Sequence, residues 1–454
     1  LPFHRERFPS VTKFRVCMLS HAPQLHLLLT KEPLTCNLCA CPVRADTLQL
    51  FINEVAVNQI QAPNDRQGVG DIRNLASKGM RVIADNRDAL FPDSDGNQIR
   101  RSRWFSPKDA AELVGVSRVA IIKRIESQND YPKGTRGANN HRYFTLEEIN
   151  QMREIHGTRP KRPDGANPFV LAVQHQKGGV SKSVTATHVA HYAAISGYRT
   201  LLIDLDAQAT TTSMCGYLPD VELSGKDTML GVYDRSVSIR DILRNTHIDG
   251  LDLVPSSGEL YHLEGRISQQ MIEDPARPYF NFIRNALKEL DGRHDIIVID
   301  SPPSLLNTTT PIALAADGIV VPVPAEYPDF ATSVQYLTLF YTLLQQLEQV
   351  TGPKSYEFFK LLVSRYDANN QDSANIADWI RYTYGHNVLK HPFPLTRAIT
   401  SAGATLHTLY ELSPNEIDRR TYQRARKSLD PLMNEVLELI RRAWERQIRD
   451  LEAA

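Results

Sequence analysis

The sequence predicts an α/β protein in which a mostly parallel sheet is flanked by helices, with a smaller helical domain before it. From Phe169 onward, short apolar runs that suit buried strands alternate with helical patterns, which is typical of parallel strands joined by crossover helices. Residues 99–156 form a compact basic segment with helix-capping serines. Residues 157–168 contain three prolines and two glycines, so we expect a linker between the two parts.

The composition is that of an ordinary globular chain. The 454 residues are 42% hydrophobic and 23% charged, which excludes wholesale disorder. Lys+Arg and Asp+Glu both number 52, so any nucleic-acid binding must come from local basic patches. Five cysteines, an odd number in a long chain, indicate a reducing cytosol rather than a disulfide framework. No run approaches the ~18 apolar residues of a membrane helix, so we expect no membrane contact.

The N-terminal part carries the weakest signals. We expect residues 1–45 to be a disordered or artefactual extension. Cys36, Cys39 and Cys41 raise the alternative of a zinc or redox site, but no second pair of ligands follows at zinc-ribbon spacing. Residues 46–98 alternate apolar and polar groups and predict a helical region for oligomerisation or domain support.

The segment at 99–156 predicts a winged helix-turn-helix domain. Ser106 is a helix N-cap with Pro107 in the first turn, Gly115 breaks the chain, and Ser117 caps a second helix. We expect that second helix to direct its basic side chains to a duplex. Residues 133–144 follow as a basic hairpin, a layout that resembles MerR-like winged domains.

The charge of this segment favours DNA binding. Residues 100–162 hold 14 Lys/Arg against 7 Asp/Glu in an otherwise neutral chain. Val119, Ile122 and Ile125 are expected to pack inward. The expected DNA contacts are Ser117, Arg118, Lys123, Arg124, Lys133, Arg136 and Arg142. The alternative is a helical hairpin used only for packing.

A phosphate-binding loop is predicted after the first strand of the sheet. Residues 169–173 are continuously apolar, glycines follow, and a helix begins near Lys182 and Ser183. Glycines let backbone N–H groups approach phosphates, Lys182 supplies a point charge, and the Ser183 hydroxyl suits Mg²⁺. The strict pattern GxxxxGK[ST] is not met, because Gln176 and Ser181 occupy its glycine positions.

Three motifs together resemble the ParA/MinD ATPases. Residues 177–183 match the deviant Walker A pattern xKGGxxK[ST]; residues 200–208 match the second family motif, with alanine in place of the usual proline. Residues 295–303 match a Walker B strand that ends in Asp300. The resemblance covers residues 168–415, and the helix-turn-helix points to the large DNA-partition subgroup. It implies a P-loop NTPase fold for residues 169–415, followed by a C-terminal helix at 416–454.

The resemblance assigns roles to individual residues. Lys177 matches the signature lysine that reaches across a dimer to the partner's nucleotide; the alternative is a solvated loop lysine. Asp206 matches the carboxylate that orients the attacking water, and Lys182 completes the catalytic set. Ser183, Asp204 and Asp300 match the Mg²⁺ site; the alternative for the aspartates is strand-end capping. The expected nucleotide contacts are Lys177, Gly178, Gly179, Val180, Ser181, Lys182, Ser183 and Val184.

The resemblance also implies a function. An ATP-bound, Mg²⁺-dependent homodimer would bind non-specific DNA, and a ParB-type centromere-binding partner would stimulate slow ATP hydrolysis. Operator binding would repress the protein's own promoter, and the protein would be cytoplasmic and nucleoid-associated. Arg397 is the candidate for the non-specific DNA surface, with a local salt bridge as its alternative. Residues 327–333 resemble a family loop at the nucleotide-dependent interface.

Two rival functions remain open at this point. One is a transcriptional repressor whose operator affinity is tuned by nucleotide, with incidental hydrolysis. The other is a MinD-like membrane switch, which needs a C-terminal amphipathic anchor; residues 441–451 have little apolar surface and many charges. The sequence also leaves open whether the DNA-bound form is a dimer or a filament.

Overall fold

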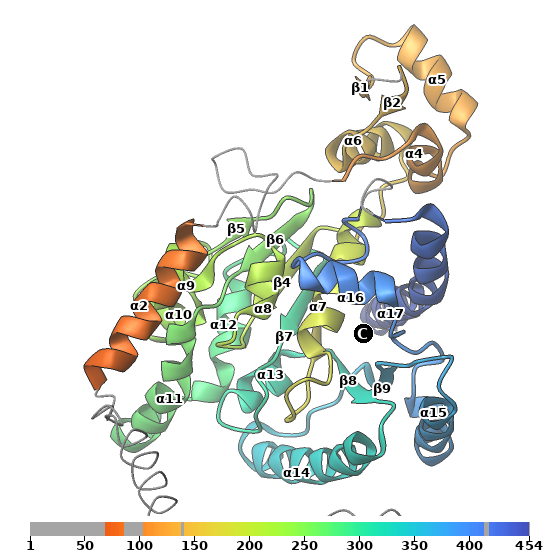
Figure 1. Cartoon of the computed structure of the whole chain (residues 1–454). Helices are drawn as coiled ribbons and strands as arrows, with labels where there is room; N and C mark the ends of the chain where they lie inside the picture. Colours follow the sequence, from red (N-terminus) through yellow and green to blue (C-terminus); the bar gives the residue numbers. More distant parts are fainter. Residues whose placement is uncertain (1–68, 86–102, 138–139, 413–416, 454) are drawn as a thin grey trace, which may run out of the picture. The chain divides into compact units, whose positions relative to one another are not determined.

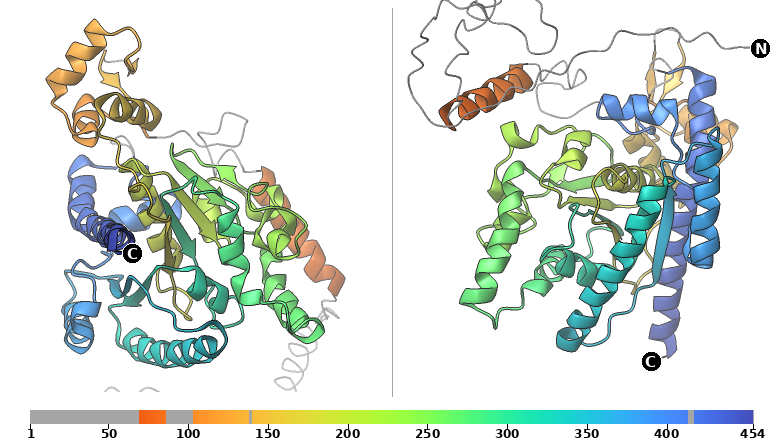
Figure 2. Two further views of the ribbon diagram at one scale, coloured as in Figure 1. Left: turned by 180° about the vertical axis from the view of Figure 1, so that it is seen from behind. Right: turned by 60° about the horizontal axis from the view of Figure 1, so that its bottom comes forward.

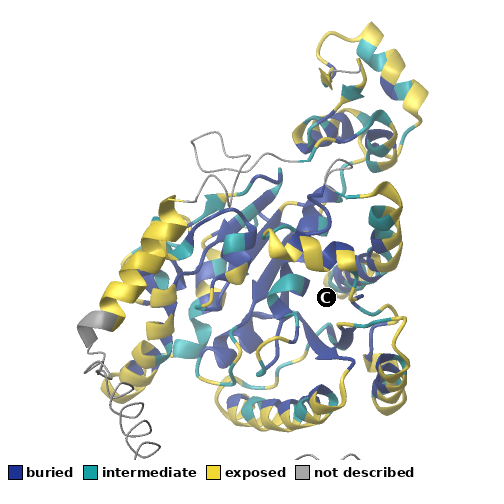
Figure 3. Ribbon diagram, viewed as in Figure 1, coloured by how far each residue is buried: buried dark blue, intermediate teal, exposed yellow. Residues whose placement is uncertain are grey.

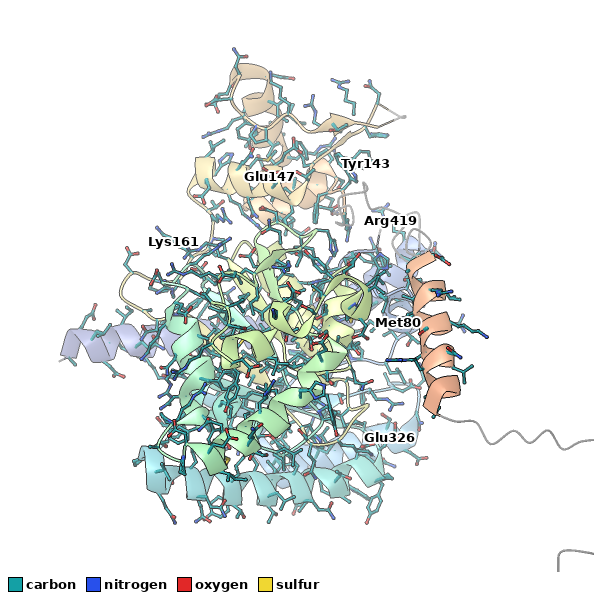
Figure 4. The ribbon with its side chains drawn as sticks, turned by 90° about the vertical axis from the view of Figure 1, so that its left-hand side faces the viewer. Met80, Tyr143, Glu147, Lys161, Glu326 and Arg419 are labelled. Atoms are coloured by element: carbon teal, nitrogen blue, oxygen red, sulfur yellow. The ribbon has the colours of Figure 1, made fainter. Side chains whose placement is uncertain are left out.

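The computed structural model describes residues 69–85, 103–137, 140–412 and 417–453 (Figure 1). The chain divides into two compact units, residues 1–75 and 76–454. The expectations for residues 1–45, including the three clustered cysteines, lie outside the described residues. Within the predicted helical region 46–98, the structure describes helix α2 (Val69–Asp85), and Met80 of this helix is labelled in Figure 4.

A seven-stranded sheet forms the centre of the second unit, with the strand order β5-β6-β4-β7-β3-β8-β9. All neighbouring strands run parallel except the short β5, which is antiparallel to β6. The strands are β3 (Phe169–Val173), β4 (Thr200–Asp204), β5 (Arg244–Asn245), β6 (Leu251–Val254), β7 (Ile296–Asp300), β8 (Gly318–Pro324) and β9 (Phe358–Ser364). The predicted fold class, a mostly parallel sheet flanked by helices, is therefore confirmed.

The register of the central strands brings three motifs to one edge of the sheet. Val173, the last residue of β3, pairs with Asp300 of β7, and Asp204 of β4 pairs with the same residue. Their apolar runs are buried on both faces, as expected for parallel strands covered by helices. The loop after β3 and both aspartates consequently meet at the carboxyl ends of adjacent strands.

The core lies on both faces of the sheet, with alternate strand residues contributing to each. Phe169, Leu171 and Val173 face one cluster, whereas Val170 and Ala172 face the other. Figures 2 and 3 show the buried sheet between helices whose outer surfaces are exposed. The first cluster includes residues of α7 (Lys182–Ile195), α16 (Arg397–Ala404) and α17 (Arg419–Ala453). The second includes residues of α10 (Met229–Tyr233), α11 (His262–Glu273), α12 (Phe282–Lys288), α13 (Thr309–Ala315), α14 (Tyr327–Thr351) and α15 (Gln371–Tyr384).

Shorter elements complete the ATPase-like part of the chain. They are α8 (Thr210–Met214), α9 (Pro219–Glu222) and the single 3₁₀ turns η1 (Gly225–Asp227), η2 (Gly258–Tyr261), η3 (Tyr279–Asn281) and η4 (Gly385–Asn387). Among the described residues, no helix combines the length and the apolar character needed to cross a membrane.

The small domain has its two helices where the caps predict them. Helix α4 (Pro107–Val114) begins with Ser106 in a capping box and ends at Gly115, whose φ of 77° is left-handed. Helix α5 (Arg118–Ser127) begins with Ser117, whose hydroxyl accepts a hydrogen bond from the Ala120 N–H. A two-stranded hairpin of β1 (Thr135–Arg136) and β2 (Arg142–Tyr143) and helix α6 (Leu146–His156) follow. Tyr143 and Glu147 are labelled there in Figure 4.

The predicted inner face of α5 is confirmed for Ile125 and wrong for Val119 and Ile122. Val119 is 61% exposed and Ile122 is 39% exposed, whereas Ile121 is fully buried and Ile125 is partly buried. Residues four apart share one face of a helix, so Ile121 and Ile125 form the buried face. Val119 and Ile122 then lie outside that face and are exposed.

Arg153 of α6 links helix α4 of the small domain to helix α7, which covers the sheet. Its guanidinium donates to the carbonyl of Leu113 in α4 (3.0 Å) and to the carbonyl of Ile195 at the end of α7 (2.9 Å). It also donates to the Asn150 side chain (2.6 Å), and burial lowers its pKa to about 10. A single hydrophobic cluster includes residues of α4, α6 and α7, so the two parts share one core.

Candidate nucleotide-binding site

The loop of residues 174–181 joins β3 to α7 through two left-handed backbone positions. These are Gly179 (φ 76°) and Ser181 (φ 77°). Glycine adopts positive φ without steric cost, whereas serine carries strain of about 1 kcal/mol. Ser181 stands where the strict Walker pattern has glycine, and the loop therefore keeps the glycine-type turn without the glycine.

Lys182 is buried at the start of α7 and turns back over this loop. Its ammonium donates to the carbonyl of Lys177 at 3.0 Å. Burial lowers the pKa of Lys182, and the nearby carboxylates of Asp300 and Asp206 act in the opposite direction. The positive charge thus lies between the glycine loop and the acidic strand ends, where a phosphate would be attracted.

Lys177 forms an ion pair with Asp329, near the start of α14. The lysine side chain is 40% exposed, whereas the aspartate side chain is 8% exposed. The Lys177 N–H donates to Nδ1 of His175 (3.0 Å), and the His175 ring stacks on Tyr336 at 4.9 Å between centroids. Burial, assisted by the charge of Lys182, lowers the pKa of His175 to about 4, so this ring is neutral at pH 7.

Asp204 uses both carboxylate oxygens to shape the neighbouring loop. One oxygen accepts the Asp206 N–H (3.1 Å), and the other accepts the N–H (2.9 Å) and hydroxyl (2.7 Å) of Thr212. Burial, followed by the proximity of Asp300, raises its pKa well above the usual value. These hydrogen bonds fit the strand-end alternative, while Oδ1, which accepts one hydrogen bond, keeps a lone pair for a metal ion or its water.

Asp300 has an oxygen available for a metal ion. Its Oδ2 accepts the Thr211 hydroxyl at 2.8 Å, whereas its buried Oδ1 has no hydrogen-bond partner among the described residues. Burial raises its pKa to about 6, and hydrogen bonding from Ser183 opposes that shift. A buried unsatisfied carboxylate oxygen beside a hydroxyl suits Mg²⁺, which prefers oxygen ligands. Ser183 and Asp300 therefore fit the ion.

Asp206 lies in the loop that follows β4. It is buried, its carboxylate accepts the Gln208 N–H (2.9 Å), and its carbonyl accepts the Ser256 hydroxyl (2.7 Å). Burial raises its pKa, whereas hydrogen bonding and the charge of Lys182 lower it. The carboxylate therefore lies within electrostatic reach of Lys182.

A pocket of about 220 Å³ adjoins the glycine loop. The Ser364 hydroxyl, at the end of β9, donates to the Val180 carbonyl (3.0 Å), which ties the far part of the sheet to the loop. The pocket lies between loop residues and a segment that follows β9, and its lining includes Gly179, Ser181, Arg365, Pro394, Leu395 and Ile399. Its size and its apolar walls suit a flat ring next to a phosphate site.

Sequence reasoning missed Asp329 and Arg365, and it considered the segment that contains Pro394 only as a candidate DNA surface around Arg397. The stretch 327–333 was singled out as an interface loop, but nothing in it identified Asp329 as the partner of Lys177. The pocket residues come from segments about 200 positions from the glycine loop and carry no motif.

Among the described residues, no group of three or more His, Cys, Asp or Glu side chains forms a metal cluster.

The candidate DNA contacts lie on the small domain and at the start of α16, a helix whose residue Ile399 also lines the pocket beside the glycine loop. Those on α5 and the hairpin are mostly exposed: Ser117, Arg118, Lys123, Lys133 and Arg136 are exposed, and Arg124 and Arg142 are half-buried. Arg142 donates to the Lys133 carbonyl, and Arg136 donates to the Asn140 side chain (2.6 Å). Arg397 is exposed at the start of α16, and no described carboxylate pairs with it.

Comparisons with known proteins identify the family of the chain. A family model described as an AAA domain matches residues 169–352. The chain is 30% identical over 388 residues to "Putative replication protein A" of Sinorhizobium fredii, covering 83% of this chain and 94% of that protein. It is 30% identical over 372 residues to "Protein SopA" of Escherichia coli K12, covering 79% and 94%.

The solved structures agree in fold. A structure described as "Partition Protein" aligns with a TM-score of 0.57 at 18% identity and covers 82% of this chain and 99% of that chain. A likeness at this identity supports the architecture, and the curated relatives supply the family. Together with the glycine loop, the paired strand-end aspartates and the long sequence matches, these findings show that the chain belongs to the ParA-type family of partition ATPases.

Proposed function

We propose that this protein is an ATP-driven switch that segregates plasmid or chromosomal DNA. ATP and Mg²⁺ would bind at the glycine loop, and the loaded protein would form a homodimer on non-specific duplex DNA. A ParB-type centromere-binding partner would stimulate slow hydrolysis and release the DNA. The observation that carries the proposal is that Lys182, at the start of α7, lies within electrostatic reach of Asp206 and of Asp300, whose strand end is in register with Asp204.

Different residues of the chain would bind the phosphates, the Mg²⁺ ion and the attacking water. Lys182 would bind the phosphates, and Ser183 with Asp300 would hold Mg²⁺, which neutralises phosphate charge when bound. Asp206 would orient the attacking water. Lys177 would leave Asp329 and reach the nucleotide of a second subunit, where a cation stabilises developing charge as an arginine finger does.

The small domain would supply a second, sequence-specific mode of binding. Exposed Arg118 and Lys123 on α5 lie on a capped helix that follows a tight turn, an arrangement suited to the major groove. Operator binding through α5 would repress the protein's own promoter. Arg397 on α16 would contact phosphates of any duplex, so the two DNA surfaces are separate in the chain.

The decisive test is ATP-dependent binding to a random-sequence duplex over a salt series. We expect ATP to strengthen binding, and Lys182→Ala and Arg397→Ala to abolish the gain. Lys226→Ala is a control because it removes an exposed positive charge far from both sites in the sequence. If the protein binds only its operator, with or without ATP, the partition proposal fails and the nucleotide-tuned repressor replaces it.

A further inference from the structure

The segment of residues 301–308 connects Asp300 to helix α13 and begins against the glycine loop. The N–H and the hydroxyl of Ser301 both donate to the carbonyl of Val173, at 3.3 and 2.8 Å. Further along, the Pro303 Cβ lies 4.0 Å from the position that a Cβ on Gly178 would take. The first half of this segment therefore packs on the phosphate-binding backbone.

The other end of the segment is held by Glu264 from helix α11. The Glu264 carboxylate accepts the N–H of Asn307 (3.0 Å) and the N–H of Thr308 (2.9 Å), and it also accepts the Thr308 hydroxyl. One turn later, Ser268 accepts the Asn307 side-chain amide (2.9 Å). Thr308 makes no side-chain cap to α13, so Glu264 supplies an acceptor at the start of that helix.

Burial of apolar side chains is only one of the interactions that hold segment 301–308 in place. Leu305 packs partly against the core, but Leu306 is 58% exposed and Pro303 is exposed. Hydrogen bonds to a carboxylate are stronger than neutral ones, and three of them converge on Glu264. Thr308 is itself buried, and its N–H and hydroxyl both use Glu264 as their acceptor.

We propose that Glu264 is a positioning residue for ATP hydrolysis. It holds segment 301–308 against the glycine loop, so that Asp300 and Gly178 keep their spacing when nucleotide is bound and hydrolysed. Among the described residues, the Glu264 carboxylate hydrogen-bonds only to Asn307 and Thr308, so its effect on the loop and on the strand-end aspartates passes through these two residues. The inference rests on the proposed ATPase function of the same site.

The test compares three variants of the full chain. Glu264→Ala removes all three hydrogen bonds, and Glu264→Gln keeps one acceptor oxygen. Glu273→Ala is the matched control, because Glu273 is exposed on the same helix and, among the described residues, accepts a hydrogen bond only from the Gln269 side chain. The readouts are hydrogen exchange of the peptide that contains residues 301–308, the kcat of DNA-stimulated ATP hydrolysis, and the Kd of a fluorescent ADP analogue.

We expect Glu264→Ala to speed exchange at Asn307 and Thr308 and to lower kcat by about tenfold, with the ADP Kd within about twofold of wild type. Glu264→Gln should recover part of both losses. Exchange and kcat that match Glu273→Ala would overturn the proposal, as would a parallel loss of ADP binding and thermal stability. If wild-type protein binds no nucleotide, the proposed function fails, while the exchange measurement still decides whether Glu264 holds the segment.

Discussion

The ion pair between Lys177 and Asp329 restrains the lysine that the proposed function sends to a second subunit. Asp329→Asn removes the negative charge and keeps the side-chain shape. Exposed pairs contribute ~0.2–1 kcal/mol, whereas loss of one partner from a buried pair costs ~3–5 kcal/mol. With the lysine 40% exposed and the aspartate 8% exposed, we take about 1.5 kcal/mol for this pair, which is roughly tenfold in an equilibrium constant.

The measurable consequence concerns self-association. Because Lys177 no longer has to leave a carboxylate, the ATP concentration that gives half-maximal dimer should fall about tenfold in Asp329→Asn. Sedimentation velocity over an ATP series measures this directly. Asp372→Asn, an exposed carboxylate on α15, controls for the charge change.

A double variant separates the restraint from other effects of Asp329. In a Lys177→Ala background, Asp329→Asn should change the ATP requirement by less than about twofold, because the restrained group is gone. The reasoning is refuted if Asp329→Asn needs as much ATP as wild type or more. In that case the ion pair with Asp329 would favour the Lys177 conformation needed for dimerisation instead of opposing it.

Three further predictions concern stability. Arg153→Met should lower the free energy of unfolding by about 3 kcal/mol in chemical denaturation, because three buried hydrogen bonds are lost and two carbonyls lose a donor. Burial lowers the pKa of His188 to about 4, so the unfolded chain binds more protons between about pH 6.5 and pH 4 and stability falls as the pH drops through that window. For this histidine alone, the free energy of unfolding at pH 5 falls by about 2 kcal/mol. In chemical denaturation, the free energy of unfolding of His188→Asn should therefore differ less between pH 7 and pH 5 than that of the wild type. Trp444→Ala should cost about 3–5 kcal/mol, measured in the same way, because the buried indole packs on Tyr198 and its N–H donates to the Asn167 carbonyl at 3.1 Å.

Much of the fold was predictable from local patterns. Continuous apolar runs identified β3, β4 and β7, because strands buried on both faces need apolar residues at successive positions. The caps at Ser106 and Ser117 placed two helix starts, since their hydroxyls satisfy backbone N–H groups within three residues. Such signals operate over a few residues and survive in any tertiary context.

The sequence was less informative about which face of a helix is buried and about the hydrogen bonds of the carboxylate oxygens. Val119 and Ile122 were expected inside, but the neighbouring elements bury Ile121 instead. Asp204 stays a predicted Mg²⁺ residue, but the sequence did not indicate that its oxygens accept hydrogen bonds from the Asp206 N–H and from Thr212. Which face of a helix is covered, and which oxygen of a carboxylate is free, depends on neighbours that sequence spacing does not specify.

The sequence by itself determined the order of the motifs, the glycine loop, the buried strands and the charge of the small domain. The tertiary structure alone decided that Asp329 holds Lys177, that the Pro394 segment lines the pocket, and that Glu264 secures residues 307–308. The physical reason is the sequence separation over which each kind of interaction acts. Propensity, capping and periodicity act between residues a few positions apart, whereas these contacts join segments tens to hundreds of positions apart that meet only when helices and strands pack.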